Sequence, residues 1–339
     1  MKRTTKIAII ISLIMISAGL LLLGFGFSMI GFDIMKINTQ TFSYETYSLE
    51  TDFTNIIVKN IDCDVRILKS EDSSCKVICP KSEKLSYSAK IENDSLVVLK
   101  TDTRKWYDYL FNMTVIDVTV YLPEKDYQKL NADISSGSVY VETGFTFETA
   151  DVKASSGSID FSGKIKKDFN VSSSSGSIKL HSVEAQNANV KASSGSINIE
   201  SVNISENFSA EFSSGSIKMK QISAEGAINI KGSSGSISVS TAECKKLDIN
   251  SSSGGIHLSN VIASDNITAK TSSGNINLEK SDANSLNLKT SSGSVKGSLL
   301  SEKIFIAKSS SGSVNVPKTT TGGVCEINTS SGSIKITVG

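Results

Sequence analysis

The 339-residue sequence is poor in residue types that several classes of protein require. Only three prolines occur, which argues against a proline-rich stalk. Three arginines (Arg3, Arg66 and Arg104) stand against many lysines, so few side chains offer the bidentate contacts that nucleic acids favour. With a formal net charge of +1, the chain also has no positive surplus to attract DNA or RNA. We therefore expect no nucleic-acid partner.

Charged residues are absent from one long stretch near the N-terminus, Ile7–Phe32. As a helix it would span about 39 Å, more than the ~30 Å hydrocarbon core of a bilayer. A cleaved signal peptide has a shorter apolar core and a small-residue cleavage site, so a retained membrane anchor is favoured over that alternative. Lys2, Arg3 and Lys6 predict a cytoplasmic tail of residues 1–6, a transmembrane helix of residues 7–32 and an extracytoplasmic C-terminal part.

The pentapeptide SSGSI and its close variants occur eleven times. Their glycines, spaced 19 or 20 residues apart, are Gly137, Gly157, Gly176, Gly195, Gly215, Gly235, Gly254, Gly274, Gly293, Gly312 and Gly332. A catalytic motif needs to occur once per active site, whereas a fixed period is the signature of a solenoid. The repetition therefore indicates architecture.

Apolar residues stand at fixed positions relative to each glycine. Leu247 and Ile249 lie seven and five positions before Gly254, Ile256 and Leu258 lie two and four after it, and most residues between them are polar. This alternation predicts short strands with one face inward. The inward positions change parity at SSG, so the chain must turn there, and we expect the glycine to supply a positive φ. We expect the one-residue variation of the period to fall in the variable segment between repeats.

The predicted fold class is therefore all-β, a single β-solenoid with 19–20-residue rungs over residues 131–339, preceded by one transmembrane helix. Residues 33–130 lack the motif and are expected to form irregular first rungs that cap the rod. Within them, RKWYDYLFNM holds the only tryptophan. Two interpretations of this segment remain open: a loop packed over the first rung, or a loop that contacts the membrane or a partner. Its candidate contact residues are Trp106, Tyr107, Tyr109 and Phe111.

Histidine and cysteine offer little chemistry in this frame. His181 and His257 fall in different columns and four rungs apart, so we expect neither a His-based catalytic triad nor a two-histidine metal site. Cys244 and Cys325 occupy inward columns four rungs apart, too distant for a disulfide. Pairing within the cap remains open, because Cys63 could reach Cys75 or Cys79 across neighbouring rungs, whereas those two are about 13 Å apart along one strand.

Carboxylates are also too sparse for carbohydrate chemistry. Among the eleven residues that lie three positions after a motif glycine, only Asp160 is acidic. Polysaccharide-cleaving β-helices gather two or three carboxylates on adjacent rungs, and calcium-binding repeats need a regular Asp. We predict no catalytic residue, no metal and no cofactor.

Three features of the sequence, taken in order along the chain, resemble those of a known protein family. One N-terminal apolar helix, then VTVYLP, then serial SSGSI rungs, resembles the bacterial putative-adhesin family of envelope β-solenoids over residues 40–339. The resemblance implies a solenoid associated with the cell envelope and supplies no catalytic or ligand residues to carry over. The wall-sorting motif LPxTG is missing, so anchoring depends on Ile7–Phe32.

Three hypotheses about function follow. The first is a non-enzymatic, membrane-anchored extracytoplasmic β-solenoid that contacts an envelope protein or glycan in an adhesin-like or envelope-stress role. The second is an envelope scaffold that self-associates by end-to-end stacking, because the uncovered edge of the last rung, SSGSIKITVG, could pair with another rod. The third, a polysaccharide-processing β-helix enzyme, is disfavoured by the missing carboxylates.

Overall fold

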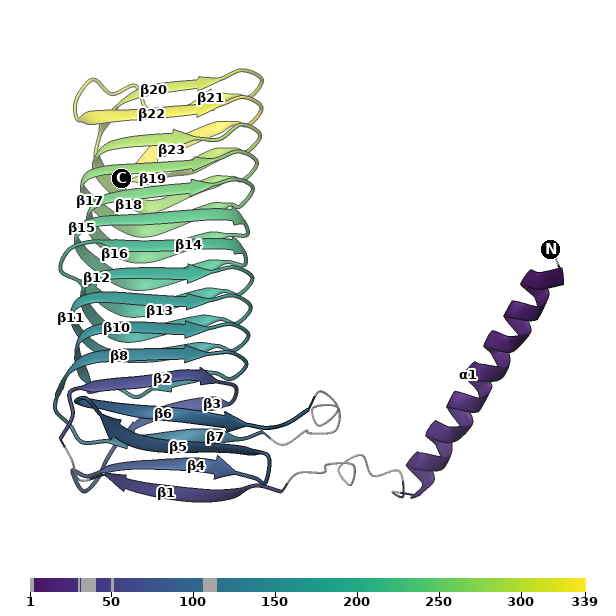
Figure 1. Ribbon diagram of the computed structural model, residues 1–339. Coiled ribbons are helices and arrows are strands. Elements are labelled where there is room, and N and C mark those ends of the chain that lie inside the picture. The colour runs from purple at the N-terminus through teal and green to yellow at the C-terminus, as the bar shows by residue number, and fades with distance from the viewer. Residues whose placement is uncertain (1–2, 30, 32–40, 50–51, 106–114) are drawn as a thin grey trace.

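The computed structural model describes residues 3–29, 31, 41–49, 52–105 and 115–339. In this part the chain forms one helix, α1 (Arg3–Met29), and strands that stack into a rod (Figure 1). The strands are β1 (Ser43–Leu49), β2 (Asn55–Ile61), β3 (Asp64–Lys69), β4 (Cys75–Lys81), β5 (Leu85–Glu92), β6 (Ser95–Asp102), β7 (Asp117–Leu122), β8 (Asp126–Ile134), β9 (Val139–Val141), β10 (Thr146–Ala154), β11 (Ile159–Ser173), β12 (Ile178–Ala192), β13 (Ile197–Ile204), β14 (Phe208–Ser214), β15 (Ile217–Ser234), β16 (Ile237–Ser251), β17 (Ile256–Thr271), β18 (Ile276–Lys289), β19 (Val295–Leu299), β20 (Lys303–Ser309), β21 (Val314–Asn315), β22 (Gly323–Thr329) and β23 (Ile334–Val338).

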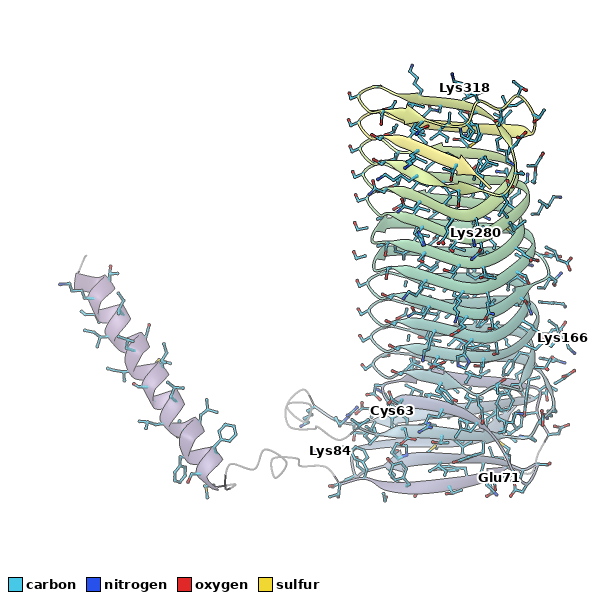
Figure 2. All side chains as sticks on the ribbon, turned by 180° about the vertical axis from the view of Figure 1, so that it is seen from behind. Cys63, Glu71, Lys84, Lys166, Lys280 and Lys318 are labelled. Atoms are coloured by element: carbon cyan, nitrogen blue, oxygen red, sulfur yellow. The ribbon has the colours of Figure 1, made fainter. Side chains whose placement is uncertain are left out.

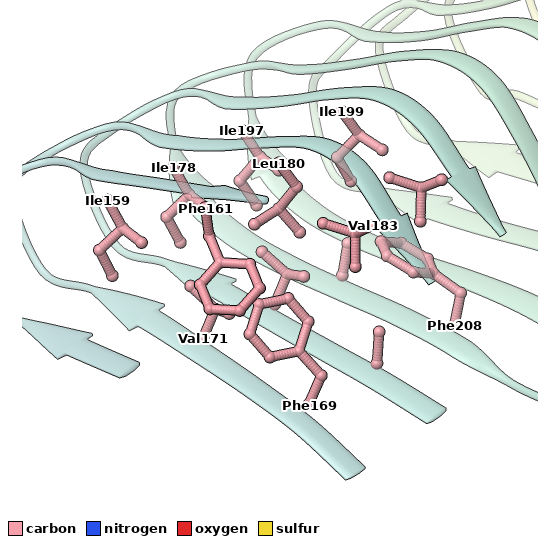
Figure 3. Close-up of a cluster of buried hydrophobic side chains, with 14 of the residues drawn as sticks. Ile159, Phe161, Phe169, Val171, Ile178, Leu180, Val183, Ile197, Ile199 and Phe208 are labelled. Atoms are coloured by element: carbon pink, nitrogen blue, oxygen red, sulfur yellow. The ribbon is translucent and has the colours of Figure 1, made fainter. Parts of the chain in front are cut away.

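The strands of successive repeats pair in parallel and in register. Ile178 of β12 lies beside Ile197 of β13, which lies beside Ile217 of β15. Ile178 and Ile197 stack inside the rod (Figure 3), and the inward-facing Val190 and Ile230 are fully buried. Identical aliphatic columns thus form one continuous core, and the predicted β-solenoid is confirmed.

The motif glycines are needed for close stacking rather than for a positive φ. Of the eleven, only Gly235 has one, at +117°. At most of the others, a Cβ would collide with the carbonyl of the corner in the neighbouring rung; a Cβ on Gly195 would lie 1.9 Å from the Gly176 oxygen. The expectation of a positive φ at these corners is therefore wrong for ten of the eleven. Glycine is required there because the neighbouring rungs approach too closely for any side chain.

A second corner lies six residues after the glycine in the central repeats. Its residue has a left-handed φ of 45–56° without being glycine, at Ser182, Ser201, Gln221, Thr241, Asn260 and Lys280. This corner restores the inward direction at the next position, where Val183, Val202 and Ile222 are buried. The sequence analysis missed it because these residues share no side-chain type.

The one-residue variation of the period falls where it was expected. Between β16 and β17 the register changes between Cys244 and Lys246, and between β17 and β18 it changes between Ala263 and Asn266. These positions lie in the segment before the next inward strand, so the columns on either side stay aligned.

A buried hydroxyl fixes many of the SSG corners. Three residues before the glycine, the Thr271 hydroxyl accepts from the Gly274 amide and donates to the Gly254 carbonyl of the preceding rung. Thr290 repeats both bonds with Gly293 and Gly274. These side chains satisfy backbone groups that the turn would otherwise leave buried and unpaired.

The order of the rungs in space departs from the sequence order at both ends. At one end, β22 pairs with β18 on one side and β20 on the other, while β23 pairs with β19 and β21. The last turn of the chain therefore lies between the two turns that precede it (Figure 1). The hydroxyl bonds agree, since Thr329 donates to Gly293 and Ser309 donates to Gly332. The outermost edge of the rod is formed by β20 and β21. Within SSGSIKITVG only residues 336–338 pair with a strand on one side alone, so the assignment of the free edge to this whole segment was wrong.

The other end has the same arrangement. The turn formed by β2 and β3 lies between β8–β9 and β6–β7, although β6 and β7 come later in the sequence. Antiparallel strands then extend the sheet: β5 pairs with β6, and β4 joins β7 to β1. We call this end, residues 41–154 with β1 to β10, the base, and the opposite end, residues 300–324, the tip.

Candidate functional site

The predicted contact loop, Trp106, Tyr107, Tyr109 and Phe111, lies outside the described residues. The structure does show the segment leading to it. The Arg104 side chain is 5% exposed, and its guanidinium lies 2.8 Å from Asp62 and 2.7 Å from Asp102. Tyr87 donates a hydrogen bond to Asp62 as well. This network of charges ties residues 102–104 to the base.

Electrostatics in this network favour the ionised carboxylates. Burial raises the pKa of Asp62, but hydrogen bonds from Tyr87 and Lys100 and the charges of Lys100 and Arg104 outweigh it, so the net shift is downward. The hydrogen bond from Arg104 holds the pKa of Asp102 well below its usual range. Both carboxylates are therefore charged at neutral pH, and the arrangement is an ion-pair network that joins β6 to the turn between β2 and β3.

All five cysteines are free and buried. The pairing of Cys63 with Cys75 or Cys79, left open by the sequence, is not formed. Burial raises the pKa of Cys75 to about 11 and that of Cys63 to about 12, so neither thiol is a ready nucleophile. Cys244 and Cys325 occupy the core positions expected of them.

His181 has neighbours that the sequence analysis did not foresee. Ser162 Oγ lies 2.9 Å from its Nδ1 and 3.0 Å from its Nε2. Nε2 is also 2.9 Å from Asp160 Oδ1, an oxygen that accepts no hydrogen bond of good geometry. The sequence does indicate this contact, because Ser162 and His181 occupy the same column on adjacent rungs and Asp160 lies two residues from Ser162.

This cluster lacks the geometry of a catalytic triad. A triad directs its serine at one ring nitrogen and its carboxylate at the other, whereas Ser162 Oγ lies about equally far from both ring nitrogens, at 2.9 and 3.0 Å, and so is aimed at neither. Ser162 is 1% exposed and cannot meet a substrate. The depression beside His181, about 530 Å³, includes two lysines paired with carboxylates, Lys179 with Asp160 at 3.3 Å and Lys220 with Glu200 at 2.9 Å. Across the described residues, no three His, Cys, Asp or Glu side chains are placed to hold a metal ion.

The tip is the described surface of the rod that differs most from the rest. Large apolar side chains are exposed there on and beside β20–β22, at Leu300, Ile304, Ile306, Val314 and Val324. Figure 2 shows the tip near Lys318, at the end of the rod opposite Glu71 and Lys84. The sequence carried this signal, because Ile306 occupies the position six before a motif glycine that Asn189, Asn229 and Asn287 fill elsewhere.

These features define a class of protein: a single-chain parallel β-solenoid with an antiparallel base, following an N-terminal apolar helix. The family model described as Toastrack DUF4097 matches residues 53–260 and 226–339. Since these matches span most of the sequence, the chain belongs to the Toastrack family.

Solved structures include three that this chain is similar to. A "putative adhesin" from Parabacteroides distasonis shares 14% identity, with a TM-score of 0.44 over 88% of this chain and 98% of that one. Another from Parabacteroides merdae shares 15%, with a TM-score of 0.46 over 77% and 97%. A "putative lipid binding protein" from P. distasonis shares 17%, with a TM-score of 0.43 over 75% and 96%. No curated protein matches the chain.

Proposed function

We propose that this protein is a membrane-anchored, non-enzymatic β-solenoid that presents its rod outside the membrane for adhesion or for contacts within the cell envelope. The observation that carries the proposal is the exposure of α1. Within it, Thr5–Met29 is long and apolar enough to cross a bilayer, and none of it is buried against the described rod. Leu13, Leu21 and Phe25 are more than half exposed, a state that is unfavourable in water and favourable in lipid.

The rod suits display rather than catalysis. Its interior is filled by stacked aliphatic side chains, and the depression beside His181 is lined in part by ion-paired lysines. Because the chain enters the rod at β1, an anchored α1 would place the base near the membrane and the tip away from it (Figure 1). The expected ligand is an envelope protein or a glycan reached by the sides or the tip of the rod.

Fractionation and protease accessibility test this proposal. We expect the full-length protein to stay in the membrane fraction after a carbonate wash and to keep its N-terminal residues when the intact mass is measured. Protease added to spheroplasts should remove the rod, and a fragment containing α1 should remain. A soluble mature protein lacking residues 1–29 would show that α1 is a cleaved signal, and a rod protected until lysis would overturn the extracytoplasmic location.

A further inference from the structure

The tip ends the rod with an open edge. β20 has one neighbouring strand, β22, and β21 has one, β23, in the part of the chain that the structure describes. The outward edge of residues 304–309 therefore presents backbone donors and acceptors to solvent, whereas the Lys303 carbonyl accepts a hydrogen bond from the Thr319 hydroxyl. Such an edge is a template for pairing with another strand.

The apolar core is also open at this edge. In the column seven before the motif glycine, Leu286 and Cys325 are fully buried, whereas Phe305 is only partly buried. Ala307 likewise ends the column that contains Leu288 and Ile327. A further layer stacked on β20 would continue both columns and remove Phe305 from water.

The outer face at this edge is apolar as well. Ile304 is 40% exposed and Ile306 is 57% exposed, and Val324 lies beside Ile304 on β22. In the covered repeats, polar side chains such as Asn187 and Asn189 hold the equivalent positions. Apolar residues thus appear on the outside of the rod where its strands run out of partners.

We propose that the occupant of this edge is the tip of a second copy of the chain, with the two β20 strands antiparallel about a two-fold axis at Ile306. This register places Ile306 opposite Ile306 of the second copy, and Phe305 opposite the smaller Ala307 of the second copy. Lys308 faces Ile304 of the second copy, so no like charges are opposed.

Charge also fits this register. Glu302 lies diagonally across from Lys308 of the second copy, within reach of a long side chain, and the two-fold axis makes this pair twice. In one copy, Lys308 is exposed and makes no ion pair within the described ranges, and the Glu302 carboxylate accepts a hydrogen bond from the Thr321 hydroxyl at 2.7 Å. Each copy therefore offers the other a free charge of the opposite sign.

The two-fold arrangement gives the contact a direction, and this step rests on the proposed anchoring by α1. Anchored rods hold their bases at the membrane, so head-to-tail stacking of tip on base is blocked. Tip-to-tip pairing joins rods that rise from two facing membranes. The tip is then a homophilic adhesion surface.

The first test measures self-association of the full-length protein in detergent micelles by sedimentation equilibrium. We expect a reversible dimer, with an Ile306→Lys variant that dissociates about 100-fold more readily, as for a residue at the centre of an interface. The matched control is Asn229→Lys, which adds the same charge in the same column on a covered rung and should dimerise as the wild type does. Circular dichroism melting of both variants checks that the rod is intact.

Reversal of the charged pair tests the register. Glu302→Lys and Lys308→Glu should each weaken the dimer about threefold, and the double variant should restore it, because the diagonal pairs re-form with exchanged signs. A double variant that is weaker than both single ones would overturn the antiparallel register.

The facing-membrane step has its own test. Phosphatidylcholine vesicles that carry the full-length protein should cluster, as followed by light scattering, and vesicles with the Ile306→Lys variant should stay dispersed. A wild-type protein that remains monomeric at ~100 μM and leaves the vesicles dispersed overturns the second copy as the occupant. That result would leave the edge to a strand of another protein and would not affect the proposed anchoring.

Discussion

Both ends of the rod protect the terminal turn of the solenoid by placing it between two other turns, but only one end is then covered. Each encloses the terminal turn of the solenoid between two others: β2–β3 lies inside the base, and β22–β23 lies inside the tip. A terminal turn with one neighbour would fray, whereas an enclosed turn is hydrogen-bonded on both edges. Enclosure thus protects the first and last turns and transfers the exposed edge to β20–β21 at the tip.

The base covers its exposed side and the tip does not. Antiparallel strands β1, β4 and β5 extend the sheet at the base, over a core that includes a cluster of aromatic rings. The rings of Tyr127 and Phe147 lie 5.9 Å apart, and those of Phe145 and Phe147 lie 6.1 Å apart. At the tip, the core stops at the half-buried Phe305. The difference indicates a sealed end and an end available for contact.

The largest expected effect is the formation or absence of an engineered disulfide, which tests the order of turns at the tip. Lys289 and Asn328 are neighbours on β18 and β22, at about one strand spacing, so a Lys289→Cys/Asn328→Cys variant should form a disulfide under mild oxidation. A Lys289→Cys/Lys308→Cys variant should not, because β22 separates these strands. Peptide mapping reads out both results, and the reverse outcome would mean that the turns stack in sequence order.

The next prediction compares the stability of the two cores. Phe147→Ala in the base should lower the free energy of unfolding by about 3–5 kcal/mol, the range for a fully buried aromatic side chain. Phe305→Ala at the tip should cost less, about 2 kcal/mol, because its side chain is already partly exposed before the change. Urea denaturation followed by tyrosine fluorescence measures both. Equal losses would show that the tip is covered in solution.

The third prediction concerns the stability of the rod between its two ends, at the corner glycines. Gly195→Ala should destabilise the rod by about 1–3 kcal/mol, because the new methyl group would meet the Gly176 carbonyl. Gly255→Ala is the matched control. Its Cβ would lie 3.7 Å from the Asn275 oxygen, an ordinary van der Waals distance, so this change should leave stability nearly unchanged. A similar loss in both variants would point to backbone flexibility rather than to close stacking as the reason for glycine.

The regular part of this fold could be predicted from sequence, whereas its ends could not. The columns around each glycine express a repeated burial pattern, so period, strand direction and core followed from them. The interchange of turns at the tip depends on Gly322 and Gly323, which let the returning chain pass within contact of Glu302 and Asn284. Nothing local distinguishes Val295 stacked on Ile334, as in this structure, from Val295 stacked on Val314, because both registers align the same columns.

The contact between Ser162, His181 and Asp160 could have been found by comparing columns. The two histidines lie far from each other, but a serine and a carboxylate lie one rung from His181. The apolar tip was visible in the same way, since Ile304 and Ile306 interrupt columns of polar residues.

The smallest expected effect is a pH dependence confined to the base. The pKa values of Asp62 and Asp102 are lower in the folded chain than in the unfolded one. Their stabilisation is therefore fully present above the unfolded value of about 4 and is lost as the pH falls below it. Asp102→Asn should cost about 1 kcal/mol at pH 7, because Arg104 loses a charged partner, and the cost should shrink at pH 3.

Hydrogen exchange can locate this effect. At pH 7, amides of β5 and β6 should exchange faster in Asp102→Asn than in the wild type, while amides of β16 should not change. Asp248→Asn, on the side of the rod in β16, is the matched control and should leave the base unaffected. Faster exchange throughout the rod in the Asp102 variant would mean that base and repeats unfold as one unit, and the two ends would then differ in chemistry but share a single stability.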